Sequence, residues 1–326
     1  MSSQLRIAAF ALAWAFTPAG AQTGLSRPLT IAVSHTPLSL PLYVAEAEGF
    51  LAAAAVKAKL IDCTGGHRCL KLLFDGEADL ATASDSALMF QSFERNDFVL
   101  LGTFVSSNDN IRLIGRKDAG VSGPAQLAGK KVGVVRGTAS QFFLDSYLLL
   151  HDVDPRTLHQ IALQPEEMAD ALRTGRVDAV AAWDPYAYAS VDALGANAQV
   201  LPPSSVYRLT FNLVAHRRLV GQRDRDLEQL LAAVERAEEL IRRQPGRAQA
   251  ILRARLGVDQ RFIDWVWPGL EYRLGLDRSL VKTLESEARW AIRGGYVTGT
   301  VVPNYVNFIY AAPLMRVNPM AVGAMH

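Results

Sequence analysis

The sequence predicts an α/β protein of two similar lobes, each a mostly parallel sheet flanked by helices, with a ligand cleft between the lobes. A pattern that occurs twice carries this prediction: LFDGEADLATASD begins at Leu73, and LRTGRVDAVAAWD begins at Leu172. Each copy reads as a helix end, a glycine turn, an aspartate, a short apolar strand and a polar loop with a second aspartate. Two copies of one unit indicate a duplicated fold and not a solenoid.

An earlier pair of strands repeats with similar spacing. The run LTIAV begins at Leu29 and the run KVGVV begins at Lys131, and each leads into a short polar loop. Strand candidates then alternate with short helical patterns, which favours parallel strands with helices on the faces of the sheet. After residue 215 we expect only helices and then a proline-containing tail. The expected strands are 29–33, 55–62, 79–83, 97–104, 111–115, 131–135, 159–163, 177–182 and 207–215. The expected helices are 39–49, 64–74, 85–94, 139–150, 166–174, 226–243, 247–255, 260–266 and 278–293.

Two breaks divide the predicted mature chain. The polar segment 106–110 comes before a strand that could cross between lobes, and Pro202-Pro203 comes before a strand that could return. The expected lobes are 22–107 plus 214–326 for the first, and 108–213 for the second.

The N-terminus, residues 1–21, is predicted to be a secretory signal peptide. Arg6 supplies a positive start, residues 7–16 are unbroken apolar sequence, and a small-residue motif fits cleavage near Ala21. The apolar run is shorter than the roughly 20 residues of a membrane span. The alternative is an ordinary buried helix. We therefore expect a periplasmic protein in an oxidising compartment.

Composition narrows the function further. The chain has 326 residues, is 50% hydrophobic and 20% charged, and carries a net charge of +2. This composition is typical of a soluble globular protein and gives no indication of a nucleic-acid partner. The motifs of serine hydrolases, zinc proteases, phosphate-binding loops and dinucleotide folds are absent from the sequence. We expect a monomer that binds a small molecule, without catalysis, metal or cofactor.

The only two cysteines, Cys63 and Cys69, lie close together. In an exported protein such a pair can form a disulfide. Free thiols are the second possibility, and a metal site with His67 is the third, although this spacing is not a familiar zinc signature. The disulfide is the leading interpretation.

Polar loops after the predicted strands are candidates for ligand contacts, because ligands of open α/β sheets bind beyond the carboxyl ends of the strands. Three of these loops are rich in Gly, Ser and Thr and lead into helices, whose free N–H groups suit an anionic or polar group. The alternative is that these residues only cap helices. The candidate loops are 34–40, 63–67, 84–86, 136–141 and 183–188.

The charge of the ligand stays open. Asp85 and Asp184 take equivalent places in the two copies, where they could cap helices or contact a ligand amine. Carboxylates in the cleft would oppose an anion. Positive side chains near these loops would favour an anionic ligand. These side chains are His35, His67, Arg68, Arg136 and Arg208.

In this order the motifs resemble the type II periplasmic binding proteins of ABC importers, in the branch with sulfonate, taurine, nitrate and thiamine-pyrimidine-precursor binders. The resemblance covers residues 29–215 clearly and the helical remainder loosely. Its motifs are PLYVA from Pro41, EGF from Glu48, GEAD from Gly76, LAGKKVGV from Leu127, Gly137-Thr138 with Phe143-Leu144, Ala171-Leu172, GRVDA from Gly175 and WDPY from Trp183.

The resemblance implies an extracytoplasmic solute-binding protein that closes about a hinge on a small polar organic ligand. It also implies an ABC transporter permease in the inner membrane as the partner that receives the ligand. Two features depart from the family pattern: Asp184 stands where glutamate is common, and the cysteine pair is unusual. The implied ligand contacts are Ser34, His35, Thr36, Thr64, Gly65, Gly66, Ser84, Asp85, Gly137, Thr138, Trp183 and Asp184.

Three other functions share this fold. Thiamine-pyrimidine-precursor synthases are enzymes, but they carry a cysteine-rich motif that this chain lacks. Effector domains of LysR-type regulators follow a helix-turn-helix, whereas this chain begins with a predicted signal peptide. A receptor that feeds a signalling protein instead of a permease would have the same sequence features, so the sequence does not separate it from the transport receptor.

Overall fold

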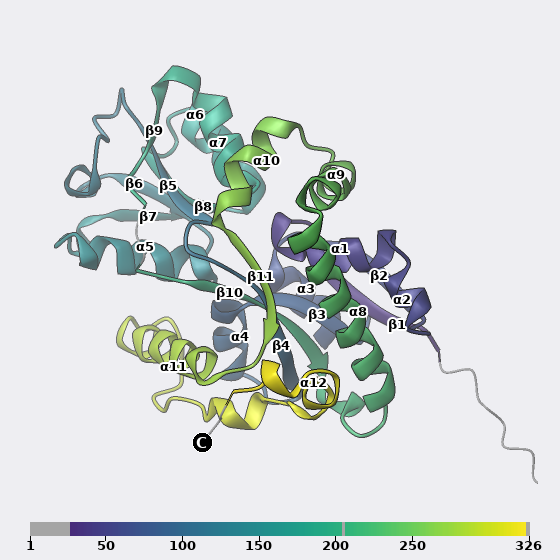
Figure 1. Ribbon diagram of the computed structural model, residues 1–326. Coiled ribbons are helices and arrows are strands. Elements are labelled where there is room, and N and C mark those ends of the chain that lie inside the picture. The colour runs from purple at the N-terminus through teal and green to yellow at the C-terminus, as the bar shows by residue number, and fades with distance from the viewer. Residues whose placement is uncertain (1–26, 204–205, 324–326) are drawn as a thin grey trace, which may run out of the picture.

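Two β-sheets organise the chain, each with its own set of helices (Figure 1). The computed structural model describes residues 27–203 and 206–323. The predicted signal peptide, residues 1–21, lies outside the described residues.

The first sheet has the strand order β11-β4-β10-β3-β1-β2. Strand β1 lies between β2 and β3 and is parallel to both, while β10 is antiparallel to β3 and to β4. Strand β11 adds an antiparallel edge against β4. The strands are β1 (Leu29–Ser34), β2 (Ala58–Cys63), β3 (Leu80–Ser84), β4 (Phe98–Ser107), β10 (Leu209–His216) and β11 (Leu270–Gly275).

The second sheet has the order β7-β6-β8-β5-β9. Strand β6 lies between β7 and β8 and is parallel to both, and β5 is antiparallel to β8 and β9. In each sheet most strands share one direction, as we expected: β10 and β11 run opposite to the rest of the first sheet, and β5 runs opposite to the rest of the second. The strands are β5 (Ile111–Arg116), β6 (Lys131–Val134), β7 (His159–Ala162), β8 (Ala179–Trp183) and β9 (Ala198–Val200).

Helices cover both sheets. Helix α8 shows why they form: Leu227, Leu230 and Leu231 lie on one buried stripe, and acidic residues begin the helix while arginines end it. In the part of the chain that the structure describes, no helix combines the length and apolarity of a membrane span. Around the first sheet lie α1 (Leu40–Ala47), α2 (Phe50–Ala53), α3 (Gly66–Phe74), α4 (Asp85–Ser92), α8 (Asp224–Arg243), α9 (Pro245–Leu256), α11 (Arg278–Arg293) and α12 (Ala312–Val317). The second sheet carries α5 (Ala139–Leu150), α6 (Met168–Arg173) and α7 (Tyr186–Leu194), and α10 (Gln260–Val266) packs against α7 through Tyr188 and Phe262.

Five of the described helices and strands were not expected from the sequence: α2, α7, α12, β9 and β11. The segment after residue 215 is not helical throughout, because Leu270–Gly275 forms the edge strand β11. This short run gains its strand pairing from β4, which is far away in the sequence, so it has little local signal. The loop expected at 183–188 continues as helix α7 after Pro185, a residue well suited to the start of a helix.

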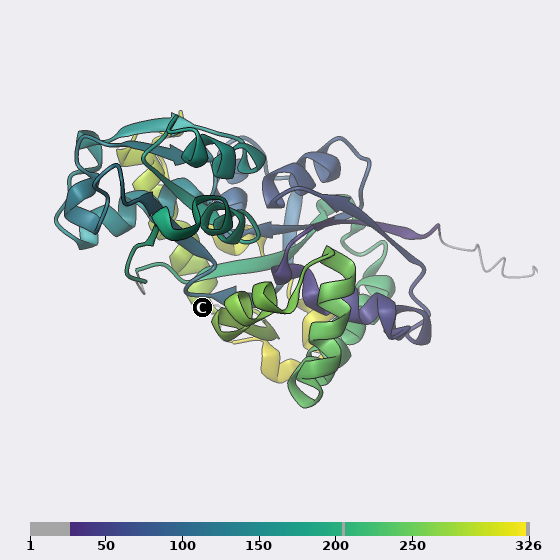
Figure 2. The same ribbon diagram turned by 90° about the horizontal axis from the view of Figure 1, so that it is seen from above.

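Two crossings connect the sheets. The chain leaves the first sheet after β4 and enters the second at β5, and it returns between β9 and β10 (Figures 1 and 2). Strand β10 already pairs in the first sheet from Leu209. On sheet membership alone, residues 209–213 thus go with the first sheet and not with the second lobe, while the lobe boundaries themselves stay a prediction.

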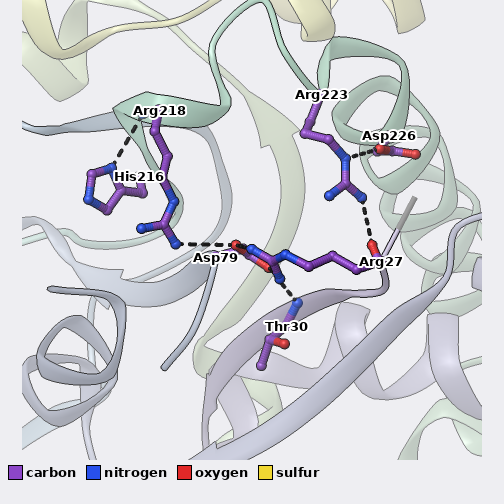
Figure 3. A network of polar contacts seen from close by, with 7 residues as sticks. All are labelled: Arg27, Thr30, Asp79, His216, Arg218, Arg223 and Asp226. Carbon is purple, nitrogen blue, oxygen red and sulfur yellow. Dashed lines mark hydrogen bonds and ion pairs between the residues drawn. The ribbon is translucent and has the colours of Figure 1, made fainter. Parts of the chain in front are cut away.

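The first aspartate of the repeat ties two strands together in each copy. The Asp79 amide donates to the Thr30 carbonyl at 2.8 Å, and an Asp79 carboxylate oxygen accepts from the Thr30 amide at 3.1 Å. Asp178 makes the same two contacts with Lys131, at 2.8 and 2.9 Å. Asp79 also binds Arg27 at 2.6 and 2.7 Å and Arg218 at 3.4 Å, which fastens the start of β1 to the turn after β10 (Figure 3).

The two cysteines are joined. The Sγ atoms of Cys63 and Cys69 lie 1.98 Å apart, and the Cα atoms lie 5.5 Å apart. The bond links the end of β2 to the second turn of α3.

Candidate ligand-binding site

A small pocket lies between the two sheets, with a cavity volume of about 30 Å³, and it is partly open to solvent. The first lobe supplies the ends of β1 and β3 and the start of α3, and the second supplies the end of β8 and the start of α5. The crossing segments form the rest of the wall. The lining residues are Ser34, Thr36, Leu38, Gly65, Gly66, His67, Ser84, Ala87, Asn110, Ile111, Thr138, Ala139, Trp183, Leu209 and Phe211.

Three helices begin at this pocket. Helix α3 starts at Gly66, α4 is capped by Ser84, and α5 is capped by Thr138. The Ser84 hydroxyl accepts from the Ala87 amide at 3.3 Å, and the Thr138 hydroxyl accepts from the Ser140 amide at 3.3 Å. A helix start leaves N–H groups without acceptors and carries partial positive charge. Three such starts make the pocket electropositive without any cationic side chain.

Two glycines allow the α3 terminus to approach the pocket. A Cβ at Gly66 would lie 2.7 Å from the Ala83 Cα, so α3 can meet the end of β3 only without a side chain there. Gly65 has φ of +73°, and a Cβ on it would lie 3.0 Å from the His67 ring and 3.3 Å from the Trp183 ring. This is the physical reason for the Gly-Gly pair.

Among the residues that the structure describes, the pocket lining carries no Asp, Glu, Lys or Arg. His67 is the titratable side chain in it. Burial, and then the neighbouring Arg68, lowers the pKa of His67 below its usual value of 6.5. The imidazole is therefore neutral at pH 7 and offers one N–H donor. A charged ligand here would meet only dipoles and neutral hydrogen-bonding groups.

Three buried oxygens in the pocket have no hydrogen-bond partner among the described residues. They are Ser34 Oγ, Thr36 Oγ1 and Asn110 Oδ1, on side chains that are 0%, 2% and 4% exposed. A buried polar atom without a partner costs about 1–3 kcal/mol. Their convergence on one small pocket indicates that these groups serve a ligand, because unpaired groups of this kind call for a specific explanation.

Apolar groups complete the wall. Trp183 is 8% exposed, and its ring lies edge-on to His67 with centroids 6.5 Å apart. Phe211, Leu38 and Ile111 lie on other sides of the pocket. A polar group held at the helix starts would thus leave a short apolar or aromatic tail against these side chains.

Seven of the predicted contacts line the pocket: Ser34, Thr36, Gly65, Gly66, Ser84, Thr138 and Trp183. The others do not. His35 is half-exposed and lies 3.9 Å from Asp62, and Thr64 lies beside the Tyr186 hydroxyl. The Gly137 amide donates to Gln141 Oε1 at 3.0 Å in the turn before α5.

Asp85 is buried, and protein donors occupy its oxygens. It accepts from the Thr210 amide at 2.9 Å, from the Thr210 hydroxyl at 3.0 Å, and from the Tyr207 hydroxyl. Burial raises the pKa of Asp85 to about 6. Ser86 connects Tyr207 to Glu287 of α11, another fully buried carboxyl. Asp85 thus holds the segment before β10 and the first residues of that strand.

Asp184 is buried in a different environment. It forms an ion pair with Arg112 at 2.7 Å and accepts from the Trp265 indole N–H at 2.9 Å. Burial raises the pKa of Asp184 to about 6, even with Arg112 beside it. Arg112 also lies 4.1 Å above the Trp265 ring. This carboxylate fixes β5 and α10 to the end of β8.

Sequence reasoning missed most of the pocket floor. Asn110, Ile111, Leu209 and Phe211 all come from the two crossings between the sheets. The crossings themselves were predicted, and a segment that passes between two lobes must border the space between them. That geometric consequence was the available signal.

Residues 36–248 match a sequence model described as NMT1/THI5 like. The chain belongs to the NMT1/THI5-like family. In this family member, no group of three or more His, Cys, Asp or Glu side chains among residues 27–203 and 206–323 could hold a metal ion.

Two relatives of this NMT1/THI5-like chain are proteins assigned as aliphatic sulfonates-binding proteins. The protein of Bacillus subtilis (strain 168) is 26% identical over 53% of this chain, and the chain spans about half of that relative's length, 54%. The protein of Escherichia coli (strain K12) is 23% identical over 72% of this chain and 73% of its own.

Solved structures with the same fold include binding proteins and an enzyme. The aliphatic sulphonate binding protein SsuA of Escherichia coli has a TM-score of 0.75 at 20% identity, over 87% of this chain and 97% of its own. SsuA of Xanthomonas axonopodis pv. citri, bound to MOPS, has a TM-score of 0.74 at 17% identity, over 87% and 98%. A desulfurization enzyme, DSZB, bound to biphenyl-2-sulfinic acid, has a TM-score of 0.66 at 17% identity, over 90% and 99%. This family member therefore has the two-lobed fold of periplasmic binding proteins.

Proposed function

We propose that this protein is an extracytoplasmic solute-binding protein of an ABC importer, and that it holds a small organic sulfonate between its lobes. The carrying observation is the pair of buried, unpartnered hydroxyls of Ser34 and Thr36, in a pocket at which three helices begin. A sulfonate presents three acceptor oxygens and one negative charge, which helix starts and hydroxyl or imidazole donors satisfy. Export through a signal peptide cleaved near Ala21 and delivery to a permease complete this proposal.

Charge supports an anion over a cation. The described lining holds no carboxylate, and the two candidate carboxylates, Asp85 and Asp184, are occupied by protein donors. An ammonium ligand would find no counter-ion there. The names of the relatives, both assigned to aliphatic sulfonates, agree with this chemistry.

Size supports a short ligand. The pocket has a cavity volume of only about 30 Å³, and apolar side chains close its inner walls. A sulfonate with a short alkyl tail places its head at the helix starts and its tail on Trp183 or Phe211.

A matched series of small molecules tests the ligand class. Calorimetry of the mature protein at pH 7 would compare ethanesulfonate, propionate and ethylammonium. We expect ethanesulfonate to bind most tightly and ethylammonium not to bind. A ligand at 100 times its Kd adds about 2.7 kcal/mol to the free energy of unfolding, so thermal unfolding gives an independent readout. Binding of ethylammonium alone would refute the proposal.

Thr36→Val tests whether the unpartnered oxygens serve the ligand. Removal of the buried Thr36 hydroxyl should leave the unliganded protein equally or more stable, because no protein hydrogen bond is lost. The same change should weaken ethanesulfonate binding about tenfold, since a donor to the ligand is lost. The control is Thr103→Val, which removes the hydrogen bond to Asn212 at 2.6 Å outside the pocket. It should lower stability by about 1 kcal/mol and leave affinity unchanged.

A further inference from the structure

The disulfide encloses the part of the first lobe that faces both the pocket and the second lobe. Cys63 and Cys69 are six residues apart, and Gly65, Gly66 and His67 between them line the pocket. Arg68, also inside this Cys63–Cys69 loop, reaches the second lobe.

Arg68 makes direct contacts between the lobes. Its Nη1 lies 2.7 Å from Glu166 Oε1, and its Nη2 lies 3.0 Å from Gln164 Oε1 and 3.3 Å from Glu166 Oε2. Glu166 and Gln164 follow β7, which takes in the second sheet the place that β2 takes in the first. The equivalent loops of the two lobes therefore meet beside the pocket.

We propose that the Cys63–Cys69 disulfide is a positioning element for the ligand site, which holds the start of α3 and Arg68 in the geometry that closes the lobes on the ligand. This inference rests on the proposed function as a binding protein. The consequence is that ligand affinity depends on the disulfide, and that the Arg68 contact supports binding only while the disulfide is intact.

The anchoring of the loop explains why a cross-link matters here. One end is fixed, because the Cys63 carbonyl accepts from the His35 amide at 2.9 Å at the end of the first sheet. The other end is fixed because Cys69 is fully buried in α3. Between them the chain contains two consecutive glycines, which have the greatest backbone freedom to lose. The cross-link removes much of that freedom before the ligand arrives, and preorganisation of this kind increases affinity.

The ion pair alone is too exposed to close the lobes. The side chains of Arg68 and Glu166 are 38% and 47% exposed, and exposed pairs have small effects because solvent screens them. Their contribution depends on Arg68 being held in place, since a fixed side chain loses little entropy when it pairs. The disulfide and Glu166 should therefore be coupled, although they lie in different lobes.

A double-mutant cycle tests this coupling. The four forms of the mature protein are the wild type, Cys63→Ser/Cys69→Ser, Glu166→Gln, and the combination of these changes. With ethanesulfonate as the probe, loss of the disulfide should weaken affinity about tenfold. Glu166→Gln should weaken affinity about threefold with the disulfide and have no effect without it. Asp170→Asn, which removes an exposed pair with Arg173 inside the second lobe, is the control and should change nothing. Unchanged affinity without the disulfide, or additive effects, would overturn the inference.

Hydrogen exchange gives a readout that needs no ligand. The amides of residues 68 and 69 both donate to the Gly65 carbonyl. Without the disulfide, these two amides should exchange at least about tenfold faster, while amides in the core strands of both sheets stay protected. Equal protection of the two amides in both forms would overturn the inference. If ethanesulfonate fails to bind the wild type, the proposed ligand fails, and exchange at residues 68 and 69 alone decides the role of the disulfide.

A second route covers the case in which the serine variant does not fold. The folded wild type can be treated with a phosphine reductant, which supplies two electrons while water supplies two protons, so that the disulfide becomes two thiols. Intact mass monitors the conversion, and exchange of the amides of Arg68 and Cys69 is then measured in the native buffer. The same acceleration is expected, and its absence would overturn the inference.

Discussion

The two copies of the repeat share their backbone design but differ in what surrounds their buried aspartates. Asp79 and Asp178 each make the same pair of contacts with the start of a parallel strand, at Thr30 and at Lys131. The second aspartates, Asp85 and Asp184, are both buried after the matching strands. Asp85 is surrounded by neutral donors, whereas Asp184 meets the Arg112 guanidinium.

The difference teaches that a local pattern sets a turn, while distant segments set its electrostatics. Asp85 contacts the segment before β10, and Asp184 contacts β5 and α10. Both carboxylates therefore hold connections between the lobes. One of them does so through an ion pair, and the other through hydroxyl and amide groups beside a second buried carboxyl, Glu287.

The largest expected contrast lies between Asp184→Asn and Asp85→Asn. The first leaves Arg112, whose side chain is 14% exposed, without its buried partner, and should lower the free energy of unfolding by about 3–5 kcal/mol. The second replaces a carboxylate that only neutral groups contact, and should cost about 1 kcal/mol. Denaturant unfolding of both variants measures the difference. Equal losses of unfolding free energy would mean that the charge of the group contacting each carboxylate does not affect the cost.

The loops after β2 and β7 provide the next contrast. The first is closed by the disulfide, and the second by a capping box in which Glu167 Oε2 accepts from the Gln164 amide at 2.7 Å. Loss of the disulfide should lower the free energy of unfolding by about 2 kcal/mol. Glu167→Ala should cost about 1 kcal/mol. Intact mass should also rise by about two hydrogens on reduction of the wild type. No rise in mass would contradict the bond itself.

A smaller contrast separates Asp79 from Asp178. Asp79→Asn weakens contacts with Arg27 and Arg218, although both arginines are largely exposed, and should cost about 1.5 kcal/mol. Asp178→Asn keeps an oxygen that can accept from the Lys131 amide, so it should cost about 0.5 kcal/mol. Thermal unfolding of the two variants under identical conditions compares them. A larger loss for Asp178→Asn would show that the strand contact outweighs the arginines.

A last effect is a slope of the free energy of unfolding with pH. Burial, and then Asp85, raises the pKa of Glu287 well above its usual value, and burial raises the pKa of Asp85 to about 6. The folded state thus binds protons more tightly than the unfolded chain. Stability from these groups is complete below about pH 4 and is lost as pH rises through the folded pKa values, by at most about 1.4 kcal/mol per pH unit and proton.

Glu287→Gln removes one of the two carboxyl groups that bind a proton more tightly in the folded state than in the unfolded chain. The free energy of unfolding, measured from pH 5 to pH 8, should therefore fall less steeply for the variant than for the wild type. The hydrogen bond to Ser86 can persist, because glutamine keeps an oxygen and gains a donor. Parallel curves for the two proteins would show that Glu287 does not titrate with folding.

Most elements of both copies could be predicted because each has a local signal. The apolar strands at Leu29 and Lys131 and the helices from Asp85 and Ala139 follow from alternation, apolar runs and capping residues. Strand β11 could not be predicted, because its hydrogen bonds come from β4, far away in the sequence. Helix α7 was not predicted, because the sequence predicts one loop over residues 183–188, whereas the helix already begins at Tyr186.

Some residues of the candidate site could likewise be predicted from the sequence, and others could not. Gly65, Gly66, Ser84 and Thr138 mark helix starts, and their place at the ends of strands predicted their position in the pocket. Asp85 and Asp184 also follow strands and lie at or near helix starts, but their side chains point toward protein donors. Only the fold brings Tyr207, Arg112 and Trp265 to them, so side-chain direction could not be read from spacing.

The sequence by itself determined the duplication, most strands and helices of both copies, and the loops that could meet a ligand. These depend on neighbours within a few residues, where backbone geometry and hydrophobic periodicity decide. The tertiary structure decided that the oxygens of Ser34, Thr36 and Asn110 remain unpartnered, and that the described lining of the pocket carries no ionised side chain. Those properties depend on groups far apart in the chain, because the free energy of a buried polar atom is set by whatever the fold places next to it.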